Sequence, residues 1–173
     1  MSYKEKLEAF NATEKYKKEL DFLEMLLDDG VKEVLDYGCG NGFAAEYLNN
    51  ISCNIVFGYD KTAYHPEFQY TLPKDKRFST MYFMHSFAHI KNVVEVINSI
   101  VCKEIIVITP NRSWLFYQNK KDYTPDETVV KHYALNELIK LFEGLNFEIV
   151  VAGQFGSFEH GHNERLFLKA RRL

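Results

Sequence analysis

The chain has 173 residues, of which 46% are hydrophobic and 26% are charged, and its formal net charge is −3. This length and composition predict one globular domain over residues 1–173, with helices over 1–30 and a sheet with further helices over 31–173. The acidic balance gives no general affinity for nucleic acid or for an anionic membrane. No apolar run reaches the roughly 18 to 20 residues that cross a bilayer.

The cysteines and the amino end bear on where the protein works. Cys39, Cys53 and Cys102 are scattered and form no C-x-x-C pair, so neither a disulfide framework nor a zinc knuckle is indicated. The stretch Met1–Lys6 lacks the apolar core of a secretion signal. We therefore predict a cytoplasmic protein.

The first third of the chain predicts helix, strand, turn, helix and strand. Leucines recur at near-helical spacing over residues 4–28, where Asn11–Thr13 is expected to divide the helix and Thr13 to cap its second part. A strand over Lys32–Tyr37 leads into a glycine-rich turn and a helix over Phe43–Asn50. A second strand is predicted over Asn54–Asp60.

The middle of the chain is less regular. Residues 61–76 lack a helical pattern, and a third strand is predicted only over Phe68–Leu72. Phe78–His85 is predicted as a fourth strand and Ile90–Val101 as an amphipathic helix, with Val93, Val94, Ile97 and Val101 on its apolar face. The apolar run over Glu104–Asn111 is typical of a strand buried on both faces of a parallel sheet.

The last third predicts a loop over Arg112–Asp126 and a helix over Thr128–Phe142. Strands over Phe147–Phe155 and Arg165–Ala170 are too close together for an intervening helix, which favours an antiparallel hairpin. The element order predicts an α/β fold: a doubly wound, mostly parallel, seven-stranded sheet of the Rossmann-like type, with amino-terminal helices and a carboxyl-terminal antiparallel hairpin.

The glycine-rich turn is the clearest functional signal. In Asp36-Tyr-Gly-Cys-Gly-Asn-Gly42 the glycines lie two residues apart and precede a helix, which is typical of a turn that holds a nucleotide-type cofactor against bare backbone. Phe43 occupies the third glycine position of a dinucleotide fingerprint, and no Walker lysine follows. Asp60 lies where a β-α-β unit places the carboxylate that binds ribose hydroxyls, although a solvated turn aspartate is the alternative.

The turn resembles the D-x-G-x-G-x-G motif of class I S-adenosylmethionine-dependent methyltransferases. Tyr82–Ile90 is similar to the segment that follows the fourth strand of that family, and Ile106–Asn111 is similar to the fifth strand of its small-molecule branch. Lys131–Leu138, with the Gly-Leu-Asn-Phe that ends at Phe147, resembles the helix before the sixth strand of that branch.

The resemblance implies S-adenosylmethionine as cofactor and S-adenosylhomocysteine as product. The residues that it assigns to the cofactor site are Asp36, Tyr37, Gly38, Cys39, Gly40, Gly42, Asp60, Lys61, His85, Ser86 and Phe87.

Histidines are the candidates for a general base because they titrate near neutrality. We select His89 and His132, with a half-buried helix histidine and a capping or surface histidine as the respective alternatives. No metal is predicted, because His85 and His89 lack the glutamate of a zinc helix. The predicted substrate residues are Asn111, Arg112 and Tyr133, beside the mouth of the sheet.

The predicted function is methyl transfer from S-adenosylmethionine to an oxygen or nitrogen of a small organic acceptor. The alternative is a non-catalytic cofactor-binding or regulatory protein with the same fold, which the short segment between the second and fourth strands favours. A nicotinamide oxidoreductase is disfavoured by Phe43, and nucleic-acid methylation by the acidic charge. Neither a nucleic acid nor a membrane is expected as a partner. The sequence leaves open whether the protein forms a homodimer.

Overall fold

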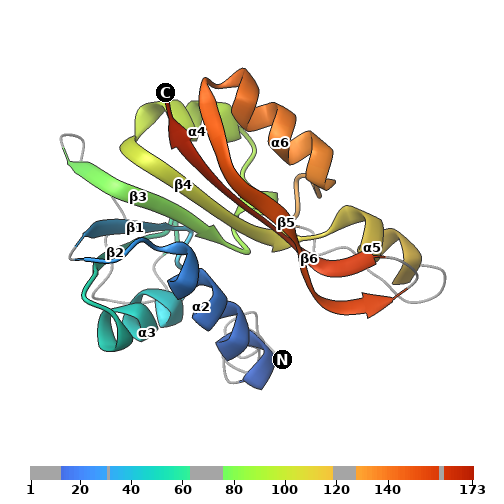
Figure 1. Ribbon diagram of the computed structural model, residues 1–173, viewed down its shortest axis with the longest axis horizontal. Coiled ribbons are helices and arrows are strands. Elements are labelled where there is room, and N and C mark those ends of the chain that lie inside the picture. Colours follow the sequence, from blue (N-terminus) through green and yellow to red (C-terminus); the bar gives the residue numbers. More distant parts are fainter. Residues whose placement is uncertain (1–12, 31, 63–75, 119–127, 160–161) are drawn as a thin grey trace.

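The computed structural model describes residues 13–30, 32–62, 76–118, 128–159 and 162–173. Within these ranges, six strands form one mixed sheet in the order β2-β1-β3-β4-β6-β5 (Figure 1). The strands are β1 (Glu33–Tyr37), β2 (Ile55–Tyr59), β3 (Arg77–Met84), β4 (Val101–Pro110), β5 (Phe147–Glu159) and β6 (His162–Arg172). The helices are α2 (Glu14–Leu26), α3 (Phe43–Ile51), the 3₁₀ turn η1 (Phe87–His89), α4 (Val93–Ser99), α5 (Arg112–Gln118) and α6 (Leu135–Gly144).

The sheet is parallel except at β6. Strands β2, β1, β3 and β4 pair in parallel, whereas β6 is antiparallel to both of its neighbours, β4 and β5. In the centre of β4, the side chains of Ile105, Ile106, Val107 and Ile108 are fully buried. Burial on both faces is what the continuous apolar run predicts, and the carboxyl ends of the parallel strands meet at one edge of the sheet.

Helices cover both faces of the sheet, as Figure 1 shows with α4 and α6 on one side and α2 and α3 on the other. One core cluster lies under α4 and α6 and includes Phe83, Phe87 and Phe142. The other lies under α2 and α3 and includes Leu20 and Leu48. The described part of the chain contains no helix long and apolar enough to span a membrane.

The beginning of α2 confirms the predicted cap. Thr13 has an extended backbone, and its hydroxyl accepts a hydrogen bond from the N–H of Tyr16 at 3.2 Å, which satisfies a donor that the helix itself leaves unpaired. The helix ends at Leu26, and Gly30 follows with a φ of 103°. The predicted start is confirmed, whereas the helix ends two residues before the predicted end at residue 28, with Leu27 in an extended conformation as its C-cap.

Helix α5 corrects the prediction of a loop over Arg112–Asp126 for residues 112–118. Asn111 caps it, because its Oδ1 accepts a hydrogen bond from the N–H of Ser113 at 3.0 Å. The asparagine signal was present in the sequence, but the aromatic residues after it show no helical period. Residues 119–127 lie outside the described residues.

Two predicted helices are shorter than expected. Helix α6 begins at Leu135 and not at Thr128, because the N–H groups of Val130 and Lys131 donate to the carbonyl of Ala88 and hold this segment extended. Helix α4 spans only Val93–Ser99, since β4 already pairs with β3 from residue 101 onward. Val94 and Val101, expected on the apolar face of that helix, are 42% and 57% exposed.

The expected seventh strand is not seen among the described residues. The stretch over Phe68–Leu72, predicted as the third strand, lies outside them, so β2 is the edge of the sheet as described. The closing strands are also longer than predicted, since β5 begins at Phe147 as expected and continues to Glu159, while β6 spans His162–Arg172.

Candidate functional site

Three glycines form the turn that leads from β1 into α3. Gly38, Gly40 and Gly42 have φ angles of 80°, 57° and 81°, in the left-handed region that glycine reaches without a Cβ penalty. The N–H of Gly38 donates to the carbonyl of Tyr59 at 2.7 Å. The turn is thus bare backbone at the carboxyl edge of parallel strands, which is where open α/β sheets bind ligands.

Asp60 braces this turn from the end of β2. Its Oδ2 accepts a hydrogen bond from the N–H of Gly40 at 2.9 Å, and its Oδ1 accepts one from the N–H of Thr62 at 2.9 Å. A carboxylate has about four lone-pair sites, so each oxygen keeps capacity for a further donor. Asp60 therefore shapes the turn and still has room to accept hydrogen bonds from a ligand.

Asp36, the last but one residue of β1, has a buried carboxyl group. It is 1% exposed, and neither of its oxygens has a well-formed hydrogen bond among the described residues, although the Tyr82 hydroxyl is close enough to affect its pKa. Burial raises the pKa of Asp36 to about 7; the nearby Tyr82 hydroxyl opposes this rise and the charge of Asp60 adds to it. Because an unpartnered buried carboxylate costs free energy, the site suits a ligand that brings a cationic hydrogen-bond donor.

The glycine turn touches the segment that follows β3. The Ser86 hydroxyl donates to the carbonyl of Tyr37 at 2.5 Å. A Cβ built on Gly38 would lie 2.4 Å from the Cβ of Ser86, a distance that real atoms do not reach. Glycine is thus required at position 38 both by its φ and by this close approach, which ties the ends of β1 and β3 together.

His85 has an unusual backbone conformation at the end of β3. Its φ is 62°, a left-handed value that costs free energy in a residue with a Cβ and is typical of functional sites. Its Nε2 lies 2.5 Å from Oε2 of Glu19 on α2, and its ring lies beside that of Tyr16, with centroids 6.1 Å apart. Helix α2 is thereby connected to the edge of the sheet that carries the glycine turn.

Glu19 is the centre of a buried network of charges. It is 3% exposed, and its Oε1 also accepts a hydrogen bond from Nε of Arg165 at 2.9 Å. Arg165 donates in turn to Glu164 at 3.1 Å, and Lys15 pairs with the same carboxylate. Each charge in the network has an opposite partner, which a group buried to this degree needs.

The protonation states of the pair follow from burial and charge. Burial would raise the pKa of Glu19, but the hydrogen bond from His85 and the charges of His85, Arg165 and Lys15 outweigh it and lower the pKa. Burial lowers the pKa of His85, despite the raising effect of Glu19. At neutral pH the pair is therefore a carboxylate that accepts a hydrogen bond from a neutral imidazole.

The two histidines predicted as bases lie in one neighbourhood beside η1. Nδ1 of His89 lies 2.8 Å from the hydroxyl of Thr128. His132 follows the extended segment that is hydrogen-bonded to Ala88, and not a helix start as expected. Burial lowers the pKa of His132, and the charge of His89 lowers it further, so both rings are close enough to interact. Among the described residues, no group of three or more His, Cys, Asp or Glu side chains could hold a metal ion.

A family model described as a methyltransferase domain matches residues 7–152, which is most of the chain. The chain belongs to the class I S-adenosylmethionine-dependent methyltransferases. The resemblance carried by the glycine turn is thereby confirmed, and S-adenosylmethionine is the cofactor of this methyltransferase domain. No curated protein sequence shows significant similarity to the chain.

Solved methyltransferases share the fold over nearly the whole chain. A S-adenosylmethionine-dependent methyltransferase from Aquifex aeolicus has a TM-score of 0.70 and 14% identity, with 100% of each chain covered. Magnesium protoporphyrin IX methyltransferase from Synechocystis PCC 6803, solved with bound S-adenosylhomocysteine, has a TM-score of 0.66 and 15% identity, over 100% of this chain and 89% of its own. A small RNA methyltransferase has a TM-score of 0.67 and 14% identity, over 91% of this chain and 25% of its own.

The residues present in the methyltransferase site fit S-adenosylmethionine. The cofactor has an ammonium group, a ribose diol and a sulfonium centre. The unpartnered carboxylate of Asp36 suits the ammonium group, because a hydrogen-bonded cation removes the cost of its burial. Asp60 has free lone pairs beside the glycine turn for the diol.

Three other residues predicted to bind the cofactor, Tyr37, Cys39 and Lys61, differ in how deeply they are buried. Tyr37 is half-buried, with its ring 4.9 Å from that of Tyr59, and burial raises its pKa to about 12. Burial also raises the pKa of the Cys39 thiol, which is therefore neutral. Lys61 is exposed directly after Asp60.

Phe87 is a correction. It was expected to border the cofactor, but its side chain is fully buried and packs against Phe83, Tyr133 and Phe142 in the core under α6. The turn at His85 and Ser86 directs the two polar side chains to the site edge and sends the next residue inward. The inward position of the Phe87 side chain is therefore explained by its packing in the core.

The three predicted substrate residues are engaged elsewhere. Asn111 is 1% exposed, and its Nδ2 donates to Gln154 at 3.1 Å and to the carbonyl of Asn163 at 2.8 Å. Tyr133 is 5% exposed and lies in the core. Arg112 is exposed and pairs with Glu137 at 2.9 Å. Asn111 and Tyr133 are thus occupied by structural contacts, and only Arg112 has the exposure that a substrate contact needs.

Tyr16, Glu19 and Arg165 were not predicted from the sequence. Tyr16 is 6% exposed, lies beside His85 and Phe43, and has its pKa raised by burial and by the charges of Asp36 and Glu19. The one available signal was an acidic residue, Glu19, among the apolar positions of α2. Its partners lie 66 and 146 residues away, so no local pattern could identify them.

Proposed function

We propose that this protein transfers the methyl group of S-adenosylmethionine to an oxygen or nitrogen of a small organic acceptor. One observation carries the proposal: an unpartnered buried carboxylate, Asp36, lies at the start of a left-handed glycine turn at the carboxyl edge of the sheet. The histidine neighbourhood of His89 and His132 follows β3, the strand beside β1.

Bound S-adenosylmethionine supplies an electrophilic methyl group on a sulfonium centre. The chain's own part is to hold and orient the reactants, because alignment of nucleophile and methyl carbon provides much of the acceleration. We assign the ammonium group to Asp36 and the ribose diol to Asp60. The backbone of Gly38, Gly40 and Gly42 forms the bare surface between them.

An acceptor that loses a proton during attack needs a base. His132 suits this role because burial and His89 lower its pKa, so its imidazole is neutral at pH 7 and able to take a proton. His89 is the second candidate, held by the Thr128 hydroxyl. We assign the proton transfer to this pair, while Arg112, being exposed, is the residue that would meet an anionic group on the acceptor.

The size class of the acceptor rests on the charge of this chain. Solved proteins with this fold include methyltransferases for a porphyrin and for small RNA, so the fold alone leaves the acceptor open. The formal charge of −3 disfavours nucleic acid, since phosphate backbones are bound by an excess of Lys and Arg. The acceptor that we favour is therefore a small organic molecule. We also propose a cytoplasmic setting and no membrane partner.

The test begins with binding. Isothermal titration with S-adenosylmethionine and S-adenosylhomocysteine should give micromolar or tighter affinity. Gly40→Val should abolish this affinity, because valine cannot adopt a φ of 57° without strain. The matched control is Gly144→Ala at the end of α6, where an added Cβ meets nothing within 4 Å. Equal affinities in wild type and Gly40→Val would contradict the assignment.

Turnover is the second step. S-adenosylhomocysteine formation is measured over a panel of phenols, carboxylic acids and amines, with a structured RNA included as the competing acceptor class. Transfer to a small molecule supports the proposal, and transfer to RNA alone contradicts it.

The alternative is a protein that binds the cofactor without transfer. The observation that favours it is the short connection from β2, which ends at Tyr59, to β3, which starts at Arg77. Tight binding of S-adenosylmethionine without formation of S-adenosylhomocysteine on any acceptor would support this alternative.

A further inference from the structure

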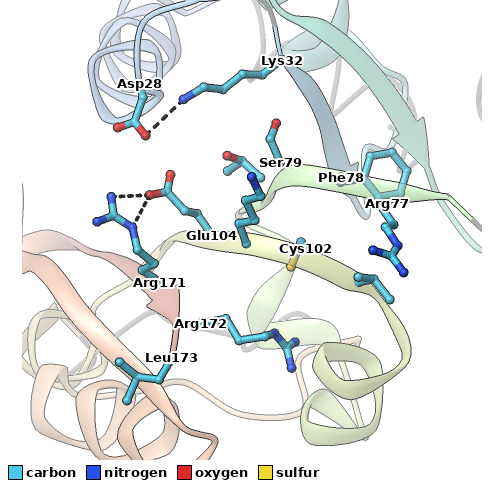
Figure 2. A pocket seen from close by; sticks show the side chains of 13 residues that line it. Asp28, Lys32, Arg77, Phe78, Ser79, Cys102, Glu104, Arg171, Arg172 and Leu173 are labelled. Atoms are coloured by element: carbon cyan, nitrogen blue, oxygen red, sulfur yellow. Dashed lines mark hydrogen bonds and ion pairs between the residues drawn. The ribbon is translucent and has the colours of Figure 1, made fainter.

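A second cleft lies at the opposite edge of the sheet from the glycine turn. It has a volume of about 640 Å³ and is lined by the amino ends of β3 and β4, the last residues of β6 and the segment between α2 and β1 (Figure 2). Its volume is within the range of small-ligand sites, about 300–1,000 Å³. Because β1, β3 and β4 are parallel, this cleft and the glycine turn are separated by the length of the strands.

Two acidic residues in the cleft are already neutralised. Asp28 pairs with Lys32 at 3.1 Å and also with Lys169, and hydrogen bonding to Lys169 lowers its pKa to about 2. Glu104 accepts hydrogen bonds from Nε and a terminal nitrogen of Arg171 at 3.0 and 2.7 Å and lies 3.3 Å from Lys169. Figure 2 shows the pairs Lys32–Asp28 and Arg171–Glu104 beside the cleft. Lys32, Lys169 and Arg171 carry three positive charges against the two negative charges of Asp28 and Glu104. This group of paired residues therefore has one positive charge in excess.

Three further cations line the cleft without a carboxylate partner among the described residues. Arg77 and Lys103 are exposed at the starts of β3 and β4. Arg172 is held by an uncharged group and a ring: a terminal nitrogen donates to the carbonyl of Ile97 at 3.2 Å, and its guanidinium lies 4.7 Å from the Phe147 ring centroid. These contacts orient the guanidinium and leave its charge uncompensated. The side chains that line the cleft therefore carry an excess of positive charge, although the whole chain has a net charge of −3.

From this arrangement we infer that the cleft binds a small molecule with two or three linked phosphate groups. Arginine guanidinium groups match phosphate oxygens in a bidentate manner, and lysine adds a point charge. Three uncompensated cations from three strands match the charge of a pyrophosphate or triphosphate better than that of a single phosphate ester. The cleft holds a compact anion, whereas a nucleic acid needs a longer basic track.

Two sources share this chemistry: inorganic polyphosphate and a nucleoside di- or triphosphate. Titration calorimetry with inorganic pyrophosphate and tripolyphosphate, and with ADP and ATP, all without magnesium, separates them. Similar affinity for tripolyphosphate and ATP assigns recognition to the phosphates alone, and tighter binding of ATP adds a nucleoside contact. Either result supports the inference, and affinity should fall as salt rises from 50 to 200 mM because the contacts are electrostatic.

The variant that tests the cleft is Arg77→Gln with Lys103→Gln. Neither side chain has an ion pair or hydrogen bond among the described residues, so the fold should be unaffected. We expect tripolyphosphate affinity to fall about 100-fold, from the loss of two charge-assisted contacts. The matched control is Lys18→Gln with Lys140→Gln, which removes two exposed lysines on α2 and α6 and should change affinity less than about threefold.

The inference is overturned if tripolyphosphate does not bind, or if both double variants weaken binding equally. It is also overturned if S-adenosylhomocysteine displaces the phosphate compound, since the ligand would then occupy the cofactor site. Tenfold tighter binding of a twelve-nucleotide single-stranded RNA, lost in the Arg77/Lys103 variant, would assign the cleft to nucleic acid and contradict a small ligand.

Discussion

Nε2 of His85 lies 2.5 Å from Oε2 of Glu19, and this contact joins the first described helix to the end of β3. His85 adopts its left-handed φ of 62° while the ring makes that contact, so the backbone strain at this position is balanced by a buried hydrogen bond to a carboxylate. The same carboxylate holds Arg165. Helix α2 is thereby placed against the edge of the sheet where the glycine turn lies, and it brings Tyr16 beside His85.

The first prediction concerns the charge of Glu19. Glu19→Gln removes one of the two carboxylates that pair with Arg165, so that Arg165 and Lys15 then share Glu164. The free energy of unfolding should fall by about 3 kcal/mol, because the buried network keeps one positive charge in excess. Urea unfolding at pH 7 measures this. Glu24→Gln, on the same helix and without an ion pair among the described residues, should change stability by less than about 0.5 kcal/mol. Equal effects of both variants would show that the buried network adds nothing to stability.

The second prediction concerns the close contact at Gly38. Gly38→Ala places a Cβ 2.4 Å from that of Ser86 at a φ of 80°, so we expect a destabilisation of more than about 1 kcal/mol together with loss of S-adenosylhomocysteine binding. Gly144→Ala has open space and a negative φ, and it should be neutral or stabilising by about 0.5 kcal/mol. Thermal unfolding with and without cofactor product tests both, and wild-type behaviour of Gly38→Ala would refute the contact.

The third prediction concerns pH. The pKa of Asp36 is raised from 3.8 to about 7 in the folded protein, so the folded state retains a proton that the unfolded state has lost. The contribution of Asp36 to the free energy of unfolding is therefore fully present below pH 4. It declines as the pH rises to about 7, by about 4 kcal/mol at most. Asp36→Asn should abolish this decline in urea unfolding curves measured between pH 4.5 and 7.5.

Cofactor binding should have the opposite dependence on the same carboxyl group. The cationic donor requires ionised Asp36, so affinity for S-adenosylmethionine should increase as pH rises through 7, up to about tenfold per pH unit below the pKa. Titration calorimetry at pH 6, 7 and 8 measures this. A flat profile in the wild type, or the same slope in Asp36→Asn, would show that Asp36 does not contact the cofactor.

The fourth prediction concerns the proposed base. His132→Gln should lower kcat on an accepted substrate by about 100-fold, as expected for loss of a general base, and leave affinity for S-adenosylhomocysteine unchanged. Burial and the charge of His89 lower the pKa of His132 from its ordinary value of 6.5. The wild-type rate should therefore rise with pH as His132 loses its proton, and it should level off once the pH exceeds this lowered pKa. A variant with normal kcat and an unaltered pH profile would eliminate His132 as the base and leave His89.

Local rules of sequence predicted the elements whose signals are local. The Thr13 cap, the buried apolar run of β4 and the glycine turn after β1 are all where residue type and spacing placed them. The family also followed from short motifs and is confirmed. Each of these features depends on neighbours a few residues away, so the chain itself carries the information.

The tertiary structure decided which side chains meet. Glu19 and His85 are 66 residues apart, and Asn111 reaches Asn163 across the end of the sheet, so residue type alone could assign Asn111 to a substrate but could not show that its amide is already hydrogen-bonded. Phe87 was separated from the cofactor edge by core packing, and the segment before α6 was held extended by Ala88. Burial and long-range hydrogen bonds depend on the packed sheet, and they determine which of several locally plausible roles a residue takes.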